Sequence, residues 1–219
     1  LMGYEWYDKL VHVPYGTVSI NGAKLATRTG NVILLRDLFA ESIAKVAAIM
    51  EEKNPNLENK EEVAESIGVG AIVFYYLSNN RIRDINFVME DALSFEGNTG
   101  PYAQYTFART CSILEKAKAE GIDFSAGGKI TAQEENDLLR TIAKFPERVD
   151  AAIAEYEPSN ITRYIIDLCT AYNRFYHNCS ILGAESEEIK NTRLVLTDAA
   201  RTVLGNAFGL ICLAKTEKI

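Results

Sequence analysis

The strongest constraint on the fold is a helical repeat of apolar residues that begins at Leu34 and continues almost to the C-terminus. In its first stretch a largely apolar series recurs with helical spacing, at Leu34, Leu35, Leu38, Ser42, Ile43, Val46 and Ile49. This spacing places them on one face of an α-helix, and Asn54-Pro55 ends it because a residue before proline disfavours helical backbone. Since each apolar face must pack on another helix, the sequence predicts a mainly α fold, a helical bundle.

Four further helices are predicted with both ends, at about 60–77, 99–121, 159–178 and 186–213. Two more are predicted by their starts alone, one at a capping box formed by Thr131 and Glu134 and one at Pro146. In the helix at 60–77, Gly68 and Gly70 each cost about 1 kcal/mol relative to alanine, so we expect close packing of another backbone there. Residues 81–100 show no clear period and are expected to form a connector.

The first thirty residues have a different character. Val11–Val13 and Thr17–Ile20 are short β-prone runs, and Asn21-Gly22 is a strong turn signal. A hairpin this small is unstable alone in water, so it either packs on the helices or belongs to a protein that continues before Leu1. The lack of methionine at position 1 agrees with the second possibility.

Composition limits the class of protein. No apolar run approaches the roughly 20 residues of a membrane helix, and no secretion signal begins the chain, so we expect a soluble cytoplasmic protein. The 4 cysteines show no C-x-x-C pairing, which favours reduced thiols and no metal site. The net charge of −7 argues against nonspecific coating of nucleic acid, so any RNA contact requires basic residues concentrated locally.

The stretch from Lys24 to Asn31 carries two cations, two threonine hydroxyls and a glycine between the β-prone runs and the first helix. Cations neutralise the charge that develops when a triphosphate is attacked, and glycine permits close backbone approach. Such a loop can therefore hold phosphates. Taken alone, an ordinary solvated turn explains the stretch equally well.

In its context this stretch resembles the KMSKS-type loop of class I arginine–tRNA ligases. The context is Val11–Gly16 before it and Leu34-Leu35-x-Asp37-Leu38 after it. The family usually reads Lys-Met-Ser-Thr-Arg-Lys-Gly-Asn, and here Leu25, Ala26 and Thr29 replace three of those residues. The resemblance implies that the loop closes over ATP and its magnesium, that Lys24 and Arg28 act in catalysis, and that ATP is bound by Lys24, Thr27, Arg28 and Gly30.

Residues 93–105, Leu-Ser-Phe-Glu-Gly-Asn-Thr-Gly-Pro-Tyr-Ala-Gln-Tyr, with Ala108-Arg109 after them, resemble the same family. A Gly/Asn/Thr stretch that opens a helix exposes N–H groups at the positive end of the dipole, which suits an RNA phosphate. A well-capped helix whose tyrosines pack in the bundle is the alternative, above all for Tyr105. The RNA contacts expected in this block are Asn98, Tyr102, Gln104 and Arg109.

The last third resembles the helical anticodon-binding domain named for its Asp-Ala-Leu-Arg signature, which reads Asp198-Ala199-Ala200-Arg201 here. Proteins read RNA loops by stacking bases on aromatic rings while arginines hold the backbone. Helical spacing places Tyr172 and Phe175 on the apolar stripe, which favours the core for both. For Asp198 and Arg201, a structural ion pair at a helix–helix seam is as good an interpretation as RNA contact. The expected RNA contacts are Tyr172, Arg174, Tyr176 and Arg193, with most weight on Arg174 and Tyr176.

The resemblance implies two parts: residues 1–95, a small β-containing remnant of the Rossmann-like catalytic domain with its connecting helices, and residues 96–219, the anticodon-binding domain. It further implies a monomeric enzyme that activates arginine with ATP and transfers it to arginine tRNA. Because the earlier part of the catalytic domain is missing, we expect the 219 residues alone to be inactive. The alternatives are a freestanding helical RNA-binding or interaction module, and an acidic helical interaction protein that binds no RNA.

Overall fold

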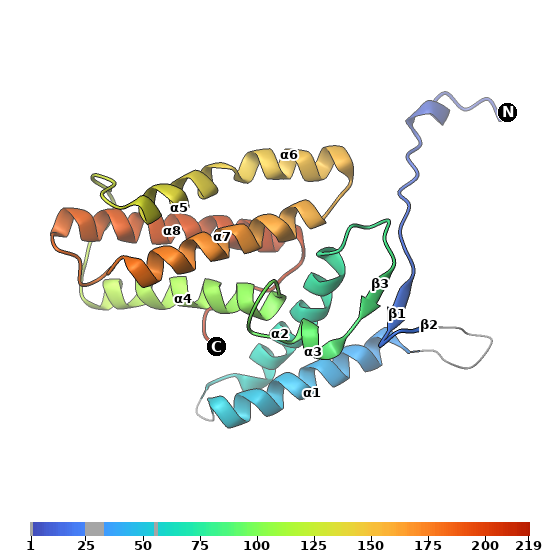
Figure 1. The fold of residues 1–219 in the computed structure, drawn as a ribbon, viewed down its shortest axis with the longest axis horizontal. Coiled ribbons are helices and arrows are strands. Elements are labelled where there is room, and N and C mark those ends of the chain that lie inside the picture. The colour runs from blue at the N-terminus through green and yellow to red at the C-terminus, as the bar shows by residue number, and fades with distance from the viewer. Residues whose placement is uncertain (1, 25–32, 55–56) are drawn as a thin grey trace.

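The computed structural model describes residues 2–24, 33–54 and 57–219. A bundle of long helices occupies one end of the molecule, and a smaller unit of helices and short strands occupies the other (Figure 1). In chain order the elements are η1 (Tyr7–Lys9), β1 (Val18–Ile20), β2 (Ala23–Lys24), α1 (Leu35–Lys53), α2 (Lys60–Leu77), β3 (Ile85–Phe87), α3 (Met89–Ala92), α4 (Gly100–Ala119), α5 (Gln133–Ala143), α6 (Phe145–Glu155), α7 (Ser159–Asn178) and α8 (Glu187–Leu210). The predicted mainly α fold is confirmed.

The three strands form one sheet in the order β2-β1-β3. β1 pairs antiparallel with β2 around Asn21 and Gly22, whose φ angles of 49° and 76° both lie in the left-handed region that a tight hairpin turn requires. β1 also pairs in parallel with β3, with Val18 opposite Ile85. The predicted hairpin is confirmed, whereas Val11–Val13 forms no strand and β3 lies inside the expected connector.

The smaller unit has its own core beneath the sheet. α1 packs along α2, and the two helices share buried apolar side chains with β3 and α3. At Gly68, a Cβ atom would lie 2.9 Å from the Cα of Ile43, so the two backbones approach more closely than any larger residue allows. The expectation of close packing at Gly68 is therefore confirmed, and its cause is α1.

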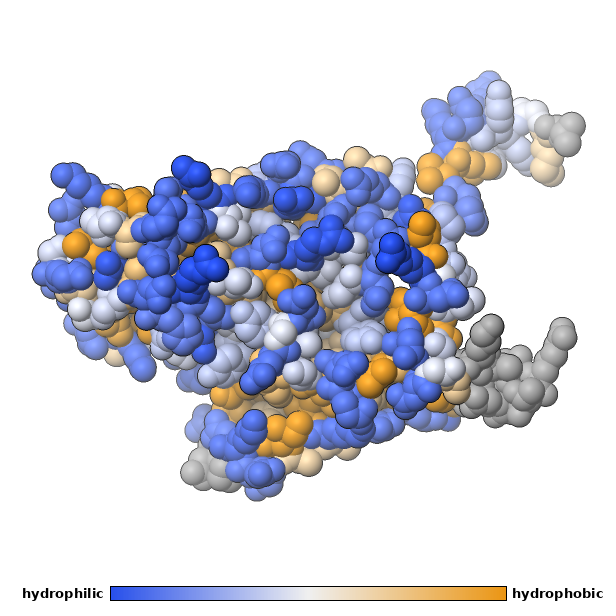
Figure 2. All heavy atoms as spheres, in the orientation of Figure 1, coloured by the Kyte–Doolittle hydropathy of each residue, from blue (hydrophilic) through white to orange (hydrophobic). Residues whose placement is uncertain are grey.

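The bundle encloses a larger core between α4, α7 and α8, which α5 and α6 cover on one side (Figure 1). Its most deeply buried rings include Tyr164, Tyr172, Phe175 and Phe208. On the face shown in Figure 2, hydrophilic side chains dominate the bundle, and hydrophobic ones gather over the smaller unit and beside the strands.

The start of α5 differs from the predicted capping box by one residue. The carboxylate that turns back belongs to Glu135, where Glu134 was expected, and it accepts hydrogen bonds from the backbone N–H groups of Thr131 at 2.6 Å and Ala132 at 3.1 Å. The physical reason is that Glu135 points into the bundle, where Arg193 neutralises it, while Glu134 faces outward.

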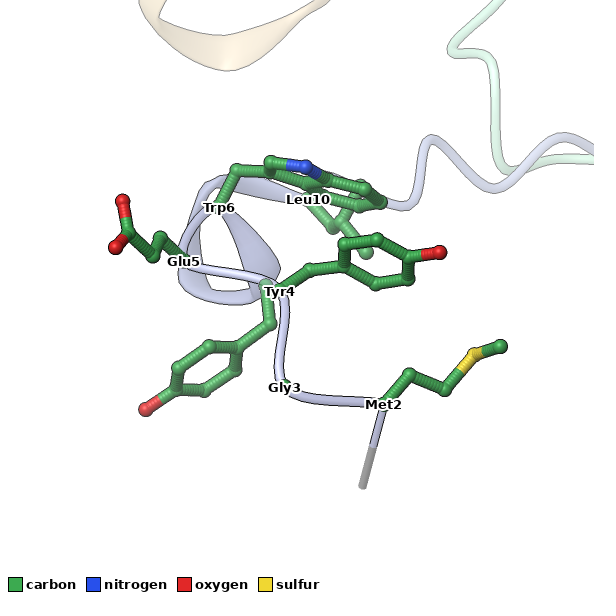
Figure 3. Close-up of a pocket in the computed structure, with 7 residues that line it drawn as sticks. Met2, Gly3, Tyr4, Glu5, Trp6 and Leu10 are labelled. Atoms are coloured by element: carbon green, nitrogen blue, oxygen red, sulfur yellow. The ribbon is translucent and has the colours of Figure 1, made fainter.

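The N-terminal segment extends away from both cores (Figure 1). The rings of Tyr4 and Trp6 stack with their centroids 4.9 Å apart, and Leu10 lies beside them (Figure 3). Both aromatic side chains stay about half exposed. Among the described residues, no helix is long and apolar enough to cross a membrane.

Candidate nucleic-acid interface

A polar network joins α4 to α7 at the amide side chain of Asn173. Its Nδ2 donates to the hydroxyl of Tyr102 at 2.9 Å and to Oγ1 of Thr106 at 3.1 Å, while its Oδ1 accepts from Nη1 of Arg109 at 2.5 Å. Both ends of the amide are therefore engaged, and the guanidinium of Arg109 is held in one orientation.

That orientation places the Arg109 guanidinium between two tyrosine rings. Its central carbon lies 5.1 Å from the ring centroid of Tyr105 and 4.7 Å from that of Tyr176, within the range of cation–π attraction. Tyr105 is 43% exposed, and Arg109 and Tyr176 are partly exposed. We call Tyr105, Arg109 and Tyr176 the stacking platform. It offers solvent two aromatic rings and a fixed cation, the groups on which proteins stack unpaired RNA bases.

Helical spacing assembles the stacking platform. Tyr105 and Arg109 are four positions apart on α4, and Asn173 and Tyr176 are three apart on α7, so each pair shares a helix face. From the sequence, Arg109 and Tyr176 were predicted RNA contacts, Tyr105 was either a stacking or a packing residue, and Asn173 had no predicted role. A polar residue next to the apolar stripe of α7 is the signal that could have identified Asn173.

The N-terminus of α4 does not provide the phosphate site expected from the sequence. Thr99 caps the helix, as predicted, by accepting from the N–H of Tyr102 at 3.2 Å. Gly100 and Pro101 are buried, and a Cβ atom on Gly100 would lie 2.9 Å from the carbonyl oxygen of Gly70. This helix end therefore abuts α2 and is closed to RNA, although Asn98 beside it is exposed.

The structure also corrects the expectation that Gln104 and Tyr172 contact RNA. Gln104 is buried, and its Nε2 donates to the backbone oxygens of Ser66 at 3.3 Å and Ala214 at 3.2 Å. It thus ties α4 to α2 and to the C-terminal segment. Tyr172 is fully buried against Phe175, as its place on the apolar stripe indicated.

Arg193 is a second correction, because it forms a buried ion pair. Its Nε donates to Oε1 of Glu135 at 2.7 Å, and its Nη1 donates to the carbonyl of Ser180 at 2.7 Å. Burial raises the pKa of the Glu135 carboxyl, but the hydrogen bonds from Arg193 and from two backbone N–H groups outweigh it and hold the pKa below its ordinary value. Arg193 is therefore occupied inside the protein and does not reach RNA.

Arg174 and Tyr176, the two residues weighted most, lie on different sides of α7. Arg174 is exposed and lines a groove with Glu134 and Asp137 of α5, whereas Tyr176 packs toward Arg109 of α4. Residues two apart on a helix point about 200° apart, so the two side chains do not form one surface. The expectation that they grip one RNA loop together is wrong for this conformation.

The remaining predicted residues lie elsewhere. Asp198 accepts from Nη2 of Arg201 at 2.7 Å, so the two residues form an ion pair, but within α8 and at a partly exposed position where a pair across a helix–helix seam was the interpretation. Lys24 ends β2, where its backbone pairs with Ser19. Thr27, Arg28 and Gly30 lie outside the described residues.

Comparison with protein families matches two segments of the chain. Residues 103–219 match the DALR anticodon binding domain, and residues 1–89 match the catalytic domain of tRNA synthetases class I (R). The two matches follow one another along the chain and together include every element described above except α3 and the start of α4.

Known proteins resemble the chain over its whole length. It is 47% identical to the arginine–tRNA ligase of Clostridium perfringens and 43% identical to that of Alkaliphilus metalliredigens, covering 100% of this chain but only 39% and 38% of theirs. The chain thus spans about two fifths of the length of these relatives. Among solved structures, Thermus thermophilus arginyl-tRNA synthetase superposes with a TM-score of 0.85 and 30% identity over 95% of this chain and 35% of that one. The arginyl-tRNA synthetase of Plasmodium falciparum superposes with a TM-score of 0.78 and 25% identity, also over 95% of this chain and 35% of that one.

Proposed function

The chain belongs to the arginine–tRNA ligase family, and from this premise we propose that it is part of an enzyme that activates arginine with ATP and transfers it to arginine tRNA. The relatives are more than twice as long as this chain, so the activity belongs to the whole protein. We assign the bundle to binding the anticodon loop and the β-containing part to the ATP site. The protein acts as a monomer in the cytoplasm.

The stacking platform is the observation that carries the RNA half of this proposal. Arg109 lies between two tyrosine rings, and Asn173 fixes it through a 2.5 Å hydrogen bond. Unpaired bases of an anticodon loop stack on such rings, and a fixed guanidinium adds charge and edge recognition. Asn98 and Arg174 are exposed outside the stacking platform and are proposed as separate RNA contacts.

The ATP half of the proposal is supported by the sequence that follows β2. Lys24 and Arg28 supply positive charge to the triphosphate, Thr27 offers a hydroxyl donor, and Gly30 permits close backbone approach. The arginine carboxylate attacks the α-phosphorus, the bond from that phosphorus to the oxygen bridging the β-phosphate breaks, and pyrophosphate leaves. Magnesium bound with ATP would neutralise part of the phosphate charge. Positive charge placed at the departing phosphates lowers the barrier, because charge builds up there in the transition state.

The test is charging of arginine tRNA by the intact protein, with the three anticodon bases substituted one at a time. We expect loss of kcat/KM of about 10-fold or more at one base at least, since a base that loses its stacking or edge contact costs about 1–3 kcal/mol. Equal charging of every substituted tRNA would refute the anticodon assignment. Binding of tRNA without arginine-dependent ATP–pyrophosphate exchange would instead support a freestanding RNA-binding module.

A further inference from the structure

Three segments that are distant in sequence meet at Arg81, in the turn after α2. Its Nη1 donates to the carbonyl of Pro14 at 2.9 Å, its Nε to that of Tyr156 at 2.9 Å, and its Nη2 to that of Glu155 at 3.4 Å. Its backbone takes part as well, because the Arg81 carbonyl accepts from the N–H of Gly16 at 2.8 Å. One residue therefore connects the N-terminal segment with the turn between α6 and α7.

The partners of Arg81 explain why this position needs a guanidinium. The carbonyls of Glu155 and Tyr156 belong to the C-terminus of α6, where the last turn of a helix leaves oxygens without helical donors and carries partial negative charge. A planar guanidinium has five donors in a fixed fork, so it satisfies separate carbonyls at once. A lysine ammonium has three donors, but all are on one nitrogen, so it cannot reach the same separate carbonyls.

On one side, Arg81 fixes the segment that leads into the sheet. A Cβ atom on Gly16 would lie 2.0 Å from the carbonyl oxygen of Arg83, so the two backbones touch there. Thr17 then donates to the carboxylate of Asp84 from its N–H at 2.8 Å and its hydroxyl at 2.7 Å. β1 begins at the next residue, and the hairpin from β1 to β2 ends at Lys24, where the proposed ATP loop starts.

On the other side, Arg81 fixes the start of the helix that carries part of the stacking platform. Glu157, next to the two carbonyls, is buried and accepts from the backbone N–H of Arg81 at 3.3 Å and from that of Ser159 at 3.3 Å. Ser159 is the first residue of α7, the helix of Asn173 and Tyr176. The contacts of Arg81 thus run continuously from α7 to β1.

We propose that Arg81 is a positioning residue that couples tRNA engagement at the stacking platform to the placement of the hairpin leading into the ATP loop. Arg81 contacts neither RNA nor ATP. Its loss separates the two sites energetically and leaves each site able to bind its own ligand. This inference rests on the proposed function.

The experiment compares Arg81→Gln and Arg81→Lys with the parent in the intact protein. Arg83→Gln is the matched control, because it removes the same charge from an exposed side chain two residues away. For each protein, filter binding gives the tRNA Kd, and charging assays give kcat and KM with native tRNA and with the anticodon-substituted tRNA that most lowers kcat in the parent.

We expect both Arg81 variants to keep the Kd within about 2-fold and to lower kcat about 10-fold, within the roughly 5–150-fold range of coupling between sites. In these variants the anticodon substitution should lower kcat no further, because the Arg81 hydrogen bonds that link the stacking platform to the hairpin are already absent. Arg83→Gln should behave as the parent does.

Several outcomes overturn the proposal. One is an anticodon substitution that lowers kcat by the same factor with and without Arg81. Another is a change in the tRNA Kd with kcat unaltered. A third is a fall in the melting temperature of both Arg81 variants that is large enough to explain the lost activity. This third outcome would mean that Arg81 has only a structural role. Failure of the parent to charge any tRNA would refute the proposed function itself, whereas normal charging by Arg81→Gln refutes this inference alone.

Discussion

At the scale of single residues, the fixed guanidinium of Arg109 carries most of the proposed RNA contact. Replacing Arg109 with glutamine removes the cation from between the rings of Tyr105 and Tyr176. We expect the tRNA Kd measured by filter binding to rise about 10-fold, since stacking and its cation–π component are worth about 1–3 kcal/mol per base.

The control for Arg109 is Arg36→Gln on α1, which removes the same charge from a side chain that is 81% exposed and outside the bundle. Its Kd should match that of the parent. Equal losses in the two variants would mean that RNA senses only the net charge of the protein, and that the stacking platform has no special role.

Glu135 makes stability depend on pH. Its folded pKa lies below its ordinary value, which is about 4.3 in an unfolded chain. The carboxylate therefore makes its full contribution to stability at pH values above the unfolded pKa. This contribution is lost as the pH falls through the folded pKa. We expect the free energy of unfolding, measured in urea, to decrease from pH 6 toward pH 3.

Glu135→Gln should remove part of that acid dependence and should also lower stability at pH 7. Removing one partner of a buried ion pair costs about 3–5 kcal/mol, because Arg193 then keeps an uncompensated charge. Glu52→Gln, at an exposed position on α1, is the control and should leave the pH profile unchanged. An unaltered profile in Glu135→Gln would show that other carboxylates dominate acid unfolding.

These residues also mark what the sequence could not predict. Arg193 looks like a surface cation in the sequence, because its partner Glu135 lies 58 positions away and becomes adjacent only when α5 packs on α8. Tyr172 was recognisable as a core residue from its helical stripe. Periodicity tells which face of a helix is buried, but it carries no information about which distant residue meets that face.

At the scale of elements, Gly68 sets the distance between α1 and α2. Alanine would favour the helix by up to about 1 kcal/mol, but its Cβ would lie 2.9 Å from both the N and the Cα of Ile43. Backbone atoms cannot rotate aside as the end of a side chain can, so overpacking should dominate. We expect Gly68→Ala to lower the free energy of unfolding by about 1–3 kcal/mol.

Gly209→Ala in the last turn of α8 is the matched control, because a Cβ atom there meets nothing within 4 Å. It should leave stability unchanged or raise it by up to about 1 kcal/mol through helix propensity alone. If Gly68→Ala were also neutral in thermal and urea unfolding, α1 would be free to shift on α2, and the proposed close packing would be wrong.

Helices were predictable from the sequence and short strands were not. The segment from Lys60 to Leu77 shows helical spacing over several turns, and the structure has α2 with these bounds. β3 contains only Ile85–Phe87, which is too short for alternation to show, and it pairs with β1 through a crossover that no local pattern reveals. The closed N-terminus of α4 was not predicted either. It is closed only because it packs on α2, and no local sequence pattern shows that contact.

At the scale of the whole molecule, two cores meet at a contact layer where α2 packs on α4, and this layer combines the apolar side chain of Phe74 with the hydrogen bonds of Gln104. One core lies in the bundle and the other lies between α1, α2, β3 and α3. Gln104 bridges them: its Nε2 donates to Ser66 on α2 and to Ala214 in the C-terminal segment, and a Cβ atom on Gly70 would lie 2.7 Å from Leu213 of that segment. The C-terminal segment thus keeps Leu213 in the bundle core and also reaches the smaller unit, where Ile219 packs.

This arrangement predicts how the 219-residue chain unfolds. Gln104→Ala removes the hydrogen bonds that its Nε2 donates to Ser66 and Ala214, at a cost of about 0.5–1.5 kcal/mol for each bond, and this cost falls on the contact layer. The units should then unfold separately. In calorimetry the parent should give one transition, and the variant two, or a van't Hoff enthalpy below the calorimetric one. Gln133→Ala, at an exposed position on α5, should unfold as the parent does. One sharp transition at a lower midpoint in Gln104→Ala would mean that the two cores form a single cooperative unit, held together by more than this layer.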